Sequence, residues 1–132
     1  MADLTSYKIL VIDDDKFLLD MYSLKFTEQG FTVETALGSE LALEKVNNGL
    51  RPDIFLVDLL MPKIDGFQLI EKFREQGIVE NRVIVILSNL GQREDVDRGL
   101  SLGVDGYIIK AAATPSEVVA KVIDISKKKH HV

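Results

Sequence analysis

The sequence of 132 residues contains no cysteine and no tryptophan, and only three prolines. Without cysteine the chain can form neither disulfides nor thiolate metal sites, which fits a reducing cytosol. No stretch approaches the roughly 18 apolar residues of a membrane-spanning helix, and the N-terminal MADLTSYK lacks the basic and apolar segments of a signal peptide. We therefore expect a cytoplasmic protein that does not enter a membrane.

Basic charge is also scarce, since 16 lysines and arginines face 21 acidic residues and the formal net charge is -5. Direct binding of nucleic acid is not expected, because it relies on a basic face that neutralises phosphates. Only the end of the chain, residues 127–132, is locally basic, and we interpret it as a short solvated tail. Residues 1–126 have the usual length of one domain, so we expect no output domain.

Five short apolar runs alternate with longer stretches that have helical spacing. The runs are YKILVID, FTVETA, DIFLVD, RVIVILS and GYIIK. Three of them, at 9–12, 54–57 and 83–87, are continuously apolar, which is typical of parallel strands covered on both faces. The alternation predicts an α/β fold with a five-stranded, doubly wound parallel sheet between helical layers, because a closed barrel needs eight such units.

Polar residues follow four of the five predicted strands, at the edge where ligands bind in open α/β sheets. In chain order they are Asp13, Asp14, Asp15, Asp58, Ser88 and Lys110. The second predicted strand has no comparable residue, which suits the outer edge of the sheet. Asp15, the third of its run, is better interpreted as the N-cap of the first helix.

If the strand order is 2-1-3-4-5, the first and third strands are neighbours and their carboxylates converge. Such carboxylates repel one another unless a cation intervenes, and Mg²⁺ is the natural hard cation for oxygen ligands. Lys110 would add a fixed positive charge, and Ser88 a hydroxyl donor. Together these groups describe a site for a phosphoryl group, in which Asp58 could act as the nucleophile and form an acyl phosphate.

These residues, in this order, resemble the response regulator receiver domain of two-component signalling over residues of about 7–126. ILVIDDDKFLL resembles the acidic pair and turn of the family, and PDIFLVDLLMPKIDGFQLI resembles its phosphoacceptor strand. VIVILS, GYIIK and TPSEVV occupy the remaining family positions. The resemblance, closest to single-domain chemotaxis-type receivers, implies a flavodoxin-like three-layer sandwich with strand order 2-1-3-4-5 and five helices.

By position, the resemblance implies that Asp58 is the phosphorylated residue and, with Asp14, a direct ligand of the Mg²⁺ cofactor. Asp13 would bind the ion through water, and the backbone carbonyl of Leu60 would be a further ligand. Leu60 and Leu90 would flank the path of the attacking water. Since neither leucine can orient a water molecule, we hypothesise slow self-dephosphorylation.

The resemblance further implies that Ser88 is the switch hydroxyl, Lys110 the phosphate-binding lysine and Tyr107 the switch aromatic. Taken alone, each could be an ordinary turn, surface or packing residue. The sequence departs from the family at Ala111, where receivers usually have a proline after a cis bond. A cis peptide bond costs about 2.5 to 4 kcal/mol when the residue after it is not proline. We therefore predict a trans Lys110–Ala111 bond and an altered loop.

The implied function is a phosphorylation-controlled switch rather than an enzyme. A sensor histidine kinase or phosphotransfer protein would donate the phosphoryl group to Asp58. A downstream protein or a second copy would bind the face of the fourth helix, fifth strand and fifth helix. Candidate residues on this face are Arg93, Asp97, Arg98, Asp105 and Tyr107.

Two other functions remain open from the residues alone. An aspartyl-nucleophile phosphohydrolase would commonly need an acid or base two residues after Asp58, where Leu60 stands. A flavodoxin-like ligand-binding module would cradle phosphate in a hydroxyl-rich loop after the first strand, where this chain has the acidic DDDK.

Overall fold

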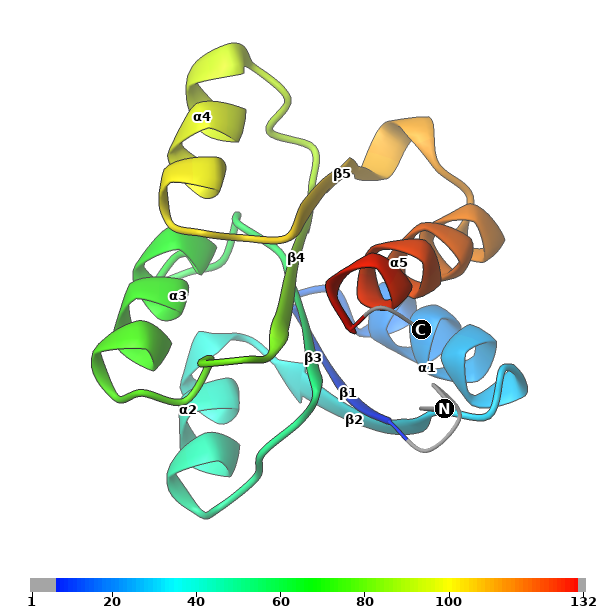
Figure 1. The fold of residues 1–132 in the computed structure, drawn as a ribbon, viewed down its shortest axis with the longest axis horizontal. Coiled ribbons are helices and arrows are strands. Elements are labelled where there is room, and N and C mark those ends of the chain that lie inside the picture. The colour runs from blue at the N-terminus through cyan, green and yellow to red at the C-terminus, as the bar shows by residue number, and fades with distance from the viewer. Residues whose placement is uncertain (1–6, 131–132) are drawn as a thin grey trace.

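The computed structural model describes residues 7–130, in which five strands alternate with five α-helices (Figure 1). The elements are β1 (Lys8–Asp13), α1 (Lys16–Glu28), β2 (Thr32–Leu37), α2 (Ser39–Asn47), β3 (Ile54–Val57), α3 (Gly66–Glu75), β4 (Val83–Ser88), α4 (Arg93–Ser101), β5 (Gly106–Ile109), the short 3-10 helix η2 (Lys110–Ala112) and α5 (Pro115–His130). The predicted alternation of strands and helices is confirmed.

The sheet has the order β2-β1-β3-β4-β5, and every neighbouring pair is parallel. This confirms the predicted order and puts β2 at an outer edge. β1 and β3 pair in a register that sets Ile12 beside Val57, and the Asp58 N–H donates to the Ile12 carbonyl at 2.9 Å. The acidic residues that follow these two strands are therefore held side by side.

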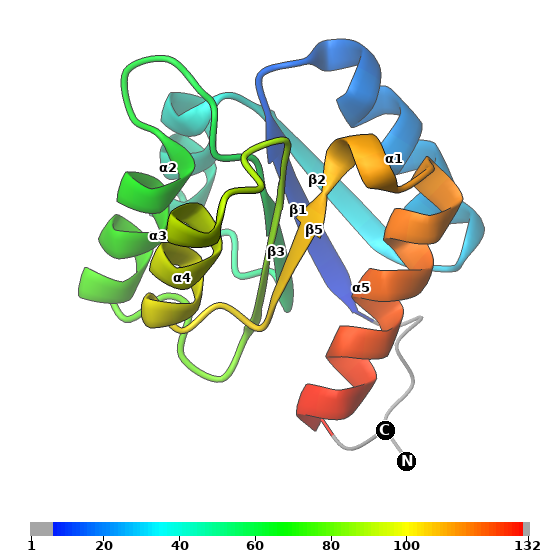
Figure 2. The same cartoon turned by 90° about the horizontal axis from the view of Figure 1, so that it is seen from above.

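Each face of the sheet carries a separate hydrophobic core, because successive side chains of a strand point to opposite faces. In β3, Phe55 and Val57 pack with α2 and α3, whereas Ile54 and Leu56 pack with α1 and α5. Figure 2 shows these helical layers on opposite sides of the sheet. The continuously apolar runs of the sequence are explained by this double cover. Within residues 7–130, no helix combines the length and apolar character needed to cross a membrane.

The last helix, α5, begins with a capping box. The Thr114 hydroxyl accepts from the Glu117 N–H at 3.2 Å, and Glu117 accepts from the Thr114 N–H at 3.0 Å, which lowers the pKa of Glu117. The helix continues to His130, so residues 127–130 of the predicted tail are helical, while 131–132 lie outside the described residues. Lys129 binds Asp105 at 3.0 Å and ties this end of α5 to the start of β5.

Candidate phosphoacceptor site

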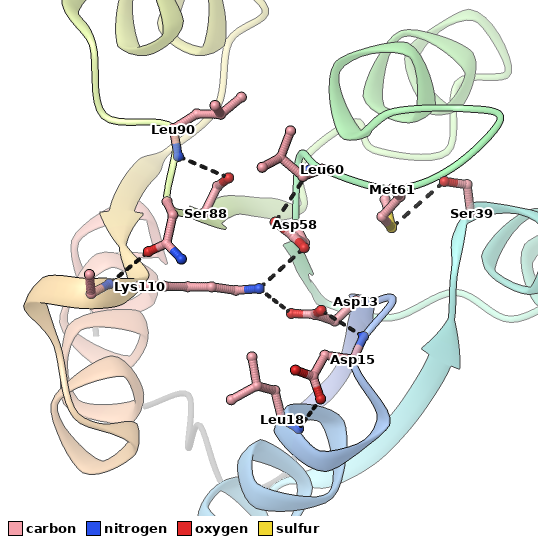
Figure 3. Close-up of polar contacts among 12 residues, drawn as sticks. Asp13, Asp15, Leu18, Ser39, Asp58, Leu60, Met61, Ser88, Leu90 and Lys110 are labelled. Carbon is pink, nitrogen blue, oxygen red and sulfur yellow. Dashed lines mark hydrogen bonds and ion pairs between the residues drawn. The ribbon is translucent and has the colours of Figure 1, made fainter.

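The polar residues that follow the strands meet at one edge of the sheet (Figure 3). Asp13 ends β1, Asp58 follows β3, Ser88 ends β4 and Lys110 follows β5. Asp15 caps α1 instead, since its side chain accepts from the Leu18 N–H, as predicted. Parallel strands end on the same side, so four segments that are distant in sequence contribute side chains to one place.

Three carboxylates form the acidic part of this edge. Asp13, Asp14 and Asp58 each offer an oxygen atom, and these atoms lie within 4.8 Å of one another. The side chains of Asp13 and Asp58 are buried, whereas Asp14 is exposed, which opens the cluster to solvent. Hard oxygen donors at this spacing, with room for water on one side, fit the coordination that Mg²⁺ prefers.

Lys110 supplies the positive charge of the site. Its Nζ lies 2.7 Å from Asp13 Oδ2 and 3.2 Å from Asp58 Oδ2, and the lysine side chain is only 13% exposed. Burial acts to lower the pKa of Lys110, but the hydrogen bond to Asp13 and the charge of Asp58 outweigh it and raise that pKa. The ammonium group therefore stays charged and bridges the two buried carboxylates.

Asp13 is held in an unfavourable environment despite this ion pair. Burial raises the pKa of its carboxyl, the charge of Asp58 raises it further, and Lys110 acts in the opposite direction. A pKa above the ordinary value of 3.8 means that the folded protein binds a proton more tightly than the unfolded chain. Stability is therefore lost as the pH rises from 3.8 through the folded-state pKa, and ionised Asp13 destabilises the metal-free protein at neutral pH.

We expect Asp13→Asn to raise the free energy of unfolding at pH 7, because the raised pKa of Asp13 makes its ionised form destabilising, and to weaken Mg²⁺ binding. Urea denaturation at pH 5 and pH 7, with a Mg²⁺ titration, measures both effects. Asp20→Asn is the matched control, because Asp20 pairs with Lys16 at the surface and its loss should change stability by less than about 0.5 kcal/mol. An Asp13→Asn protein that is less stable than the wild type at pH 7 would contradict this electrostatic explanation.

Ser88 and Leu60 border the Asp58 carboxylate. Ser88 is fully buried, and its hydroxyl accepts from the Leu90 N–H at 3.3 Å, which leaves its own proton available for donation. The Leu60 N–H lies 3.4 Å from Asp58 Oδ1, so the peptide of Leu60 is beside the carboxylate while its side chain is 55% exposed. The side chains of Leu60 and Leu90 add no proton donor or acceptor here.

Tyr107 contacts the β4–α4 loop rather than the carboxylates. Its hydroxyl donates to the Leu90 carbonyl, and its ring lies against Gly99 of α4, where an added Cβ would be 3.2 Å from the ring. Burial raises the pKa of Tyr107, as do the charges of Asp95 and Asp58. The hydroxyl therefore remains protonated and able to donate.

The predicted partner face on α4, β5 and α5 is partly engaged in contacts within the chain. The Arg98 guanidinium lies 4.2 Å from the centre of the Phe67 ring, and Asp105 accepts from the Ile84 N–H and binds Lys129. Arg93 and Asp97 form an exposed pair at 3.8 Å.

The turn that contains Lys110 has two features of note. No peptide bond within residues 7–130 is cis, so the Lys110–Ala111 bond is trans, as predicted. The Ala111 N–H donates to Asn89 Oδ1 at 2.9 Å, a contact that the sequence analysis missed. An asparagine after a strand resembles an ordinary turn residue, and its only signal was its place next to Ser88.

The model of the response regulator receiver domain family matches residues 9–123. The chain therefore belongs to this family. It is a receiver domain of the two-component type, whose general role is that of a phosphoacceptor switch.

Two curated relatives have longer chains than this one. The DNA-binding dual master transcriptional regulator RpaA of Synechocystis is 33% identical over 107 residues, which cover 78% of this chain and 42% of RpaA. The gliding motility regulatory protein of Myxococcus xanthus is 35% identical over 117 residues, which cover 89% of this chain and 15% of the relative. The chain thus spans less than half the length of either relative.

Solved receiver structures have the same fold. The receiver domain of the Francisella response regulator 1452 is 32% identical, with a TM-score of 0.82, and the match covers 93% of this chain and 98% of that one. The Vibrio cholerae chemotaxis protein CheY4 is 26% identical, with a TM-score of 0.82, and the match covers 90% of this chain and 98% of that one.

Proposed function

We propose that this chain is a signalling switch that accepts a phosphoryl group on Asp58 in a Mg²⁺-dependent reaction. The observation that carries the proposal is the position of Asp58. Its carboxylate lies 3.2 Å from the Lys110 ammonium and within 4.8 Å of oxygen atoms of Asp13 and Asp14, at the edge where the sheet meets solvent. A carboxylate next to a cation site and a fixed ammonium is suited to take up a phosphoryl group.

The donor would be a phosphohistidine of a sensor histidine kinase or phosphotransfer protein. An Asp58 carboxylate oxygen attacks phosphorus, so that an O–P bond forms, the P–N bond to the imidazole breaks, and the imidazole nitrogen takes up a proton from solvent. Asp14, Asp58 and the carbonyl of Leu60 would hold Mg²⁺, with Asp13 bound to it through water, and the ion would supply charge neutralisation at the phosphoryl group.

Lys110 and Ser88 then act as the phosphate-binding pair. Lys110 exchanges part of its pairing with Asp13 and Asp58 for phosphoryl oxygens, and the Ser88 hydroxyl donates its free proton to them. Because Leu90 donates to Ser88 and accepts from Tyr107, a change at Ser88 reaches Tyr107 and the face of α4, β5 and α5. New contacts in one state shift the balance between two conformations of that face.

Partners are part of this proposal. Phe17, at 71% exposed, and Leu60, at 55%, are among the large apolar side chains exposed near the phosphoacceptor edge, and they suit contact with a protein that brings the phosphoryl group. A downstream protein or a second copy would bind through α4, β5 and α5. We also propose a cytoplasmic location, where histidine kinases obtain their phosphoryl groups from ATP.

Incubation with acetyl phosphate and Mg²⁺, followed by intact mass measurement, tests the proposal. We expect one phosphoryl adduct per chain, greatly reduced by a chelator. Decay after removal of the donor should be slow, because Leu60 and Leu90 cannot orient an attacking water molecule. Absence of any adduct would contradict the proposed function, and rapid steady release of phosphate over many turnovers would favour a phosphohydrolase.

A further inference from the structure

Asn89 connects the two segments that carry the proposed phosphate-binding pair. It follows Ser88 at the end of β4, and its Oδ1 accepts the backbone N–H of Ala111, which follows Lys110, at 2.9 Å. The two bonded residues are 22 positions apart in sequence. One hydrogen bond therefore joins the residue after the switch hydroxyl to the residue after the lysine.

This contact depends on the chemistry of both partners. Only the oxygen of the Asn89 amide group can accept from a backbone N–H, so the orientation of the amide is determined by the bond. Ala111 can donate because it keeps its N–H, which a proline in that position would lack. This hydrogen bond can form because the chain has Ala111 where receivers usually have proline.

The turn that Asn89 contacts, η2, is held by few hydrogen bonds of its own. The 3-10 helix η2 is three residues long, and its closing bond, from the Ala113 N–H to the Lys110 carbonyl, is 3.3 Å long. Short 3-10 segments have poorer hydrogen-bond geometry than α-helices. The hydrogen bond from the Ala111 N–H to Asn89 can therefore determine the position of the Lys110 backbone.

The next two residues of the β4–α4 loop, Leu90 and Gly91, lie against β5. The Leu90 carbonyl accepts from Tyr107, and an added Cβ on Gly91 would lie 3.1 Å from Ile109 Cδ1. Three consecutive loop residues thus contact β5 or the turn after it, and Asn89 is the member that reaches the Lys110 turn.

We propose that Asn89 is a positioning residue, which holds the backbone of η2 so that the Lys110 ammonium reaches a phosphoryl group on Asp58. The inference rests on the proposed function. It adds that the reach of Lys110 is set by the loop after Ser88, so that the two phosphate-binding groups are placed together.

The test uses BeF3⁻ with Mg²⁺ as a phosphoryl mimic, titrated into the full chain. We expect Asn89→Ala to weaken binding about three- to tenfold, which is the effect of one hydrogen bond on an equilibrium. Gln92→Ala is the matched control, because it removes an amide group from the same loop. The Gln92 side chain makes no capping bond to α4, so this variant should keep the BeF3⁻ affinity within about twofold of the wild type. In a Lys110→Ala background, examined at higher BeF3⁻ concentration, Asn89→Ala should have no further effect.

A second readout is hydrogen exchange of the Ala111 amide by NMR, which should be about fivefold faster in Asn89→Ala than in the wild type. Unchanged exchange, unchanged BeF3⁻ affinity, or an equal loss of affinity with and without Lys110 would each overturn the inference and leave the proposed function standing. A wild-type protein that binds no BeF3⁻ would contradict the proposed function, and the inference with it.

Discussion

Replacement of Asp58 by asparagine is expected to abolish the phosphoryl adduct completely while preserving the fold. The amide is nearly the same size as the carboxylate but is not nucleophilic enough to attack phosphorus. Lys110 keeps its contact with Asp13 at 2.7 Å, and the Leu60 N–H keeps an oxygen acceptor. Intact mass after incubation with acetyl phosphate and Mg²⁺ measures the loss, and circular dichroism verifies the fold.

The matched control is Asp53→Asn, because Asp53 precedes the same strand at its opposite end. Its carboxylate accepts a hydrogen bond from the Lys8 N–H at 2.8 Å and lies at the opposite end of the strands from the site. This variant should form the adduct in wild-type yield. An adduct that persists in Asp58→Asn would show that another residue is the acceptor.

Replacement of Gly66 by alanine is expected to destabilise the protein by about 3 kcal/mol and to slow phosphorylation of Asp58. An added Cβ would lie 2.3 Å from the Asp58 carbonyl oxygen and 2.8 Å from the Leu59 Cα. Both are backbone atoms, so relief of the clash requires the segment that carries the phosphoacceptor to move. Chemical denaturation and the rate of adduct formation measure the two effects.

Gly77→Ala separates this clash from the general loss of a glycine. Nothing lies within 4 Å of an added Cβ there, and only its positive φ of 71° disfavours alanine, by about 1 to 2 kcal/mol. Gly66 begins α3 and Gly77 follows its last residue, Glu75, by two positions, so the two variants probe opposite ends of the same helix. If Gly66→Ala is as stable as Gly77→Ala, the start of α3 can move away from the backbone of Asp58 and Leu59 at little cost, which would contradict the prediction.

Much of the fold could be predicted because it depends on local pattern. Continuously apolar runs such as 54–57 indicated strands covered on both faces, and the alternation with helical spacing indicated parallel strands. Parallel strands end on one side, so the meeting of Asp13, Asp14 and Asp58 followed once β1 and β3 were assumed to be neighbours. The capping of α1 by Asp15 could be predicted for the same reason, since a cap and its helix are adjacent in sequence.

Individual side-chain contacts between distant segments, beyond the gathering of polar residues at one edge, could not be predicted. The bond between Asn89 and Ala111 exists because β4 and β5 are neighbours whose ends are in register, and no property of either residue alone marks it. The contact of Arg98 with Phe67 likewise depends on how α4 packs beside α3.

The order of residues along the chain was enough to predict the class of fold, the edge at which the polar residues gather and the residue types available for phosphoryl transfer. These depend on the spacing of apolar residues and on the ends of strands, which are local properties. Three contacts became known only from the packed fold: Lys110 bridges Asp13 and Asp58, Gly66 lies against the Asp58 backbone, and Asn89 accepts a hydrogen bond from the turn after Lys110. Such contacts depend on ångström-scale distances between segments far apart in the chain, and these distances are set by the packing of the sheet and helices.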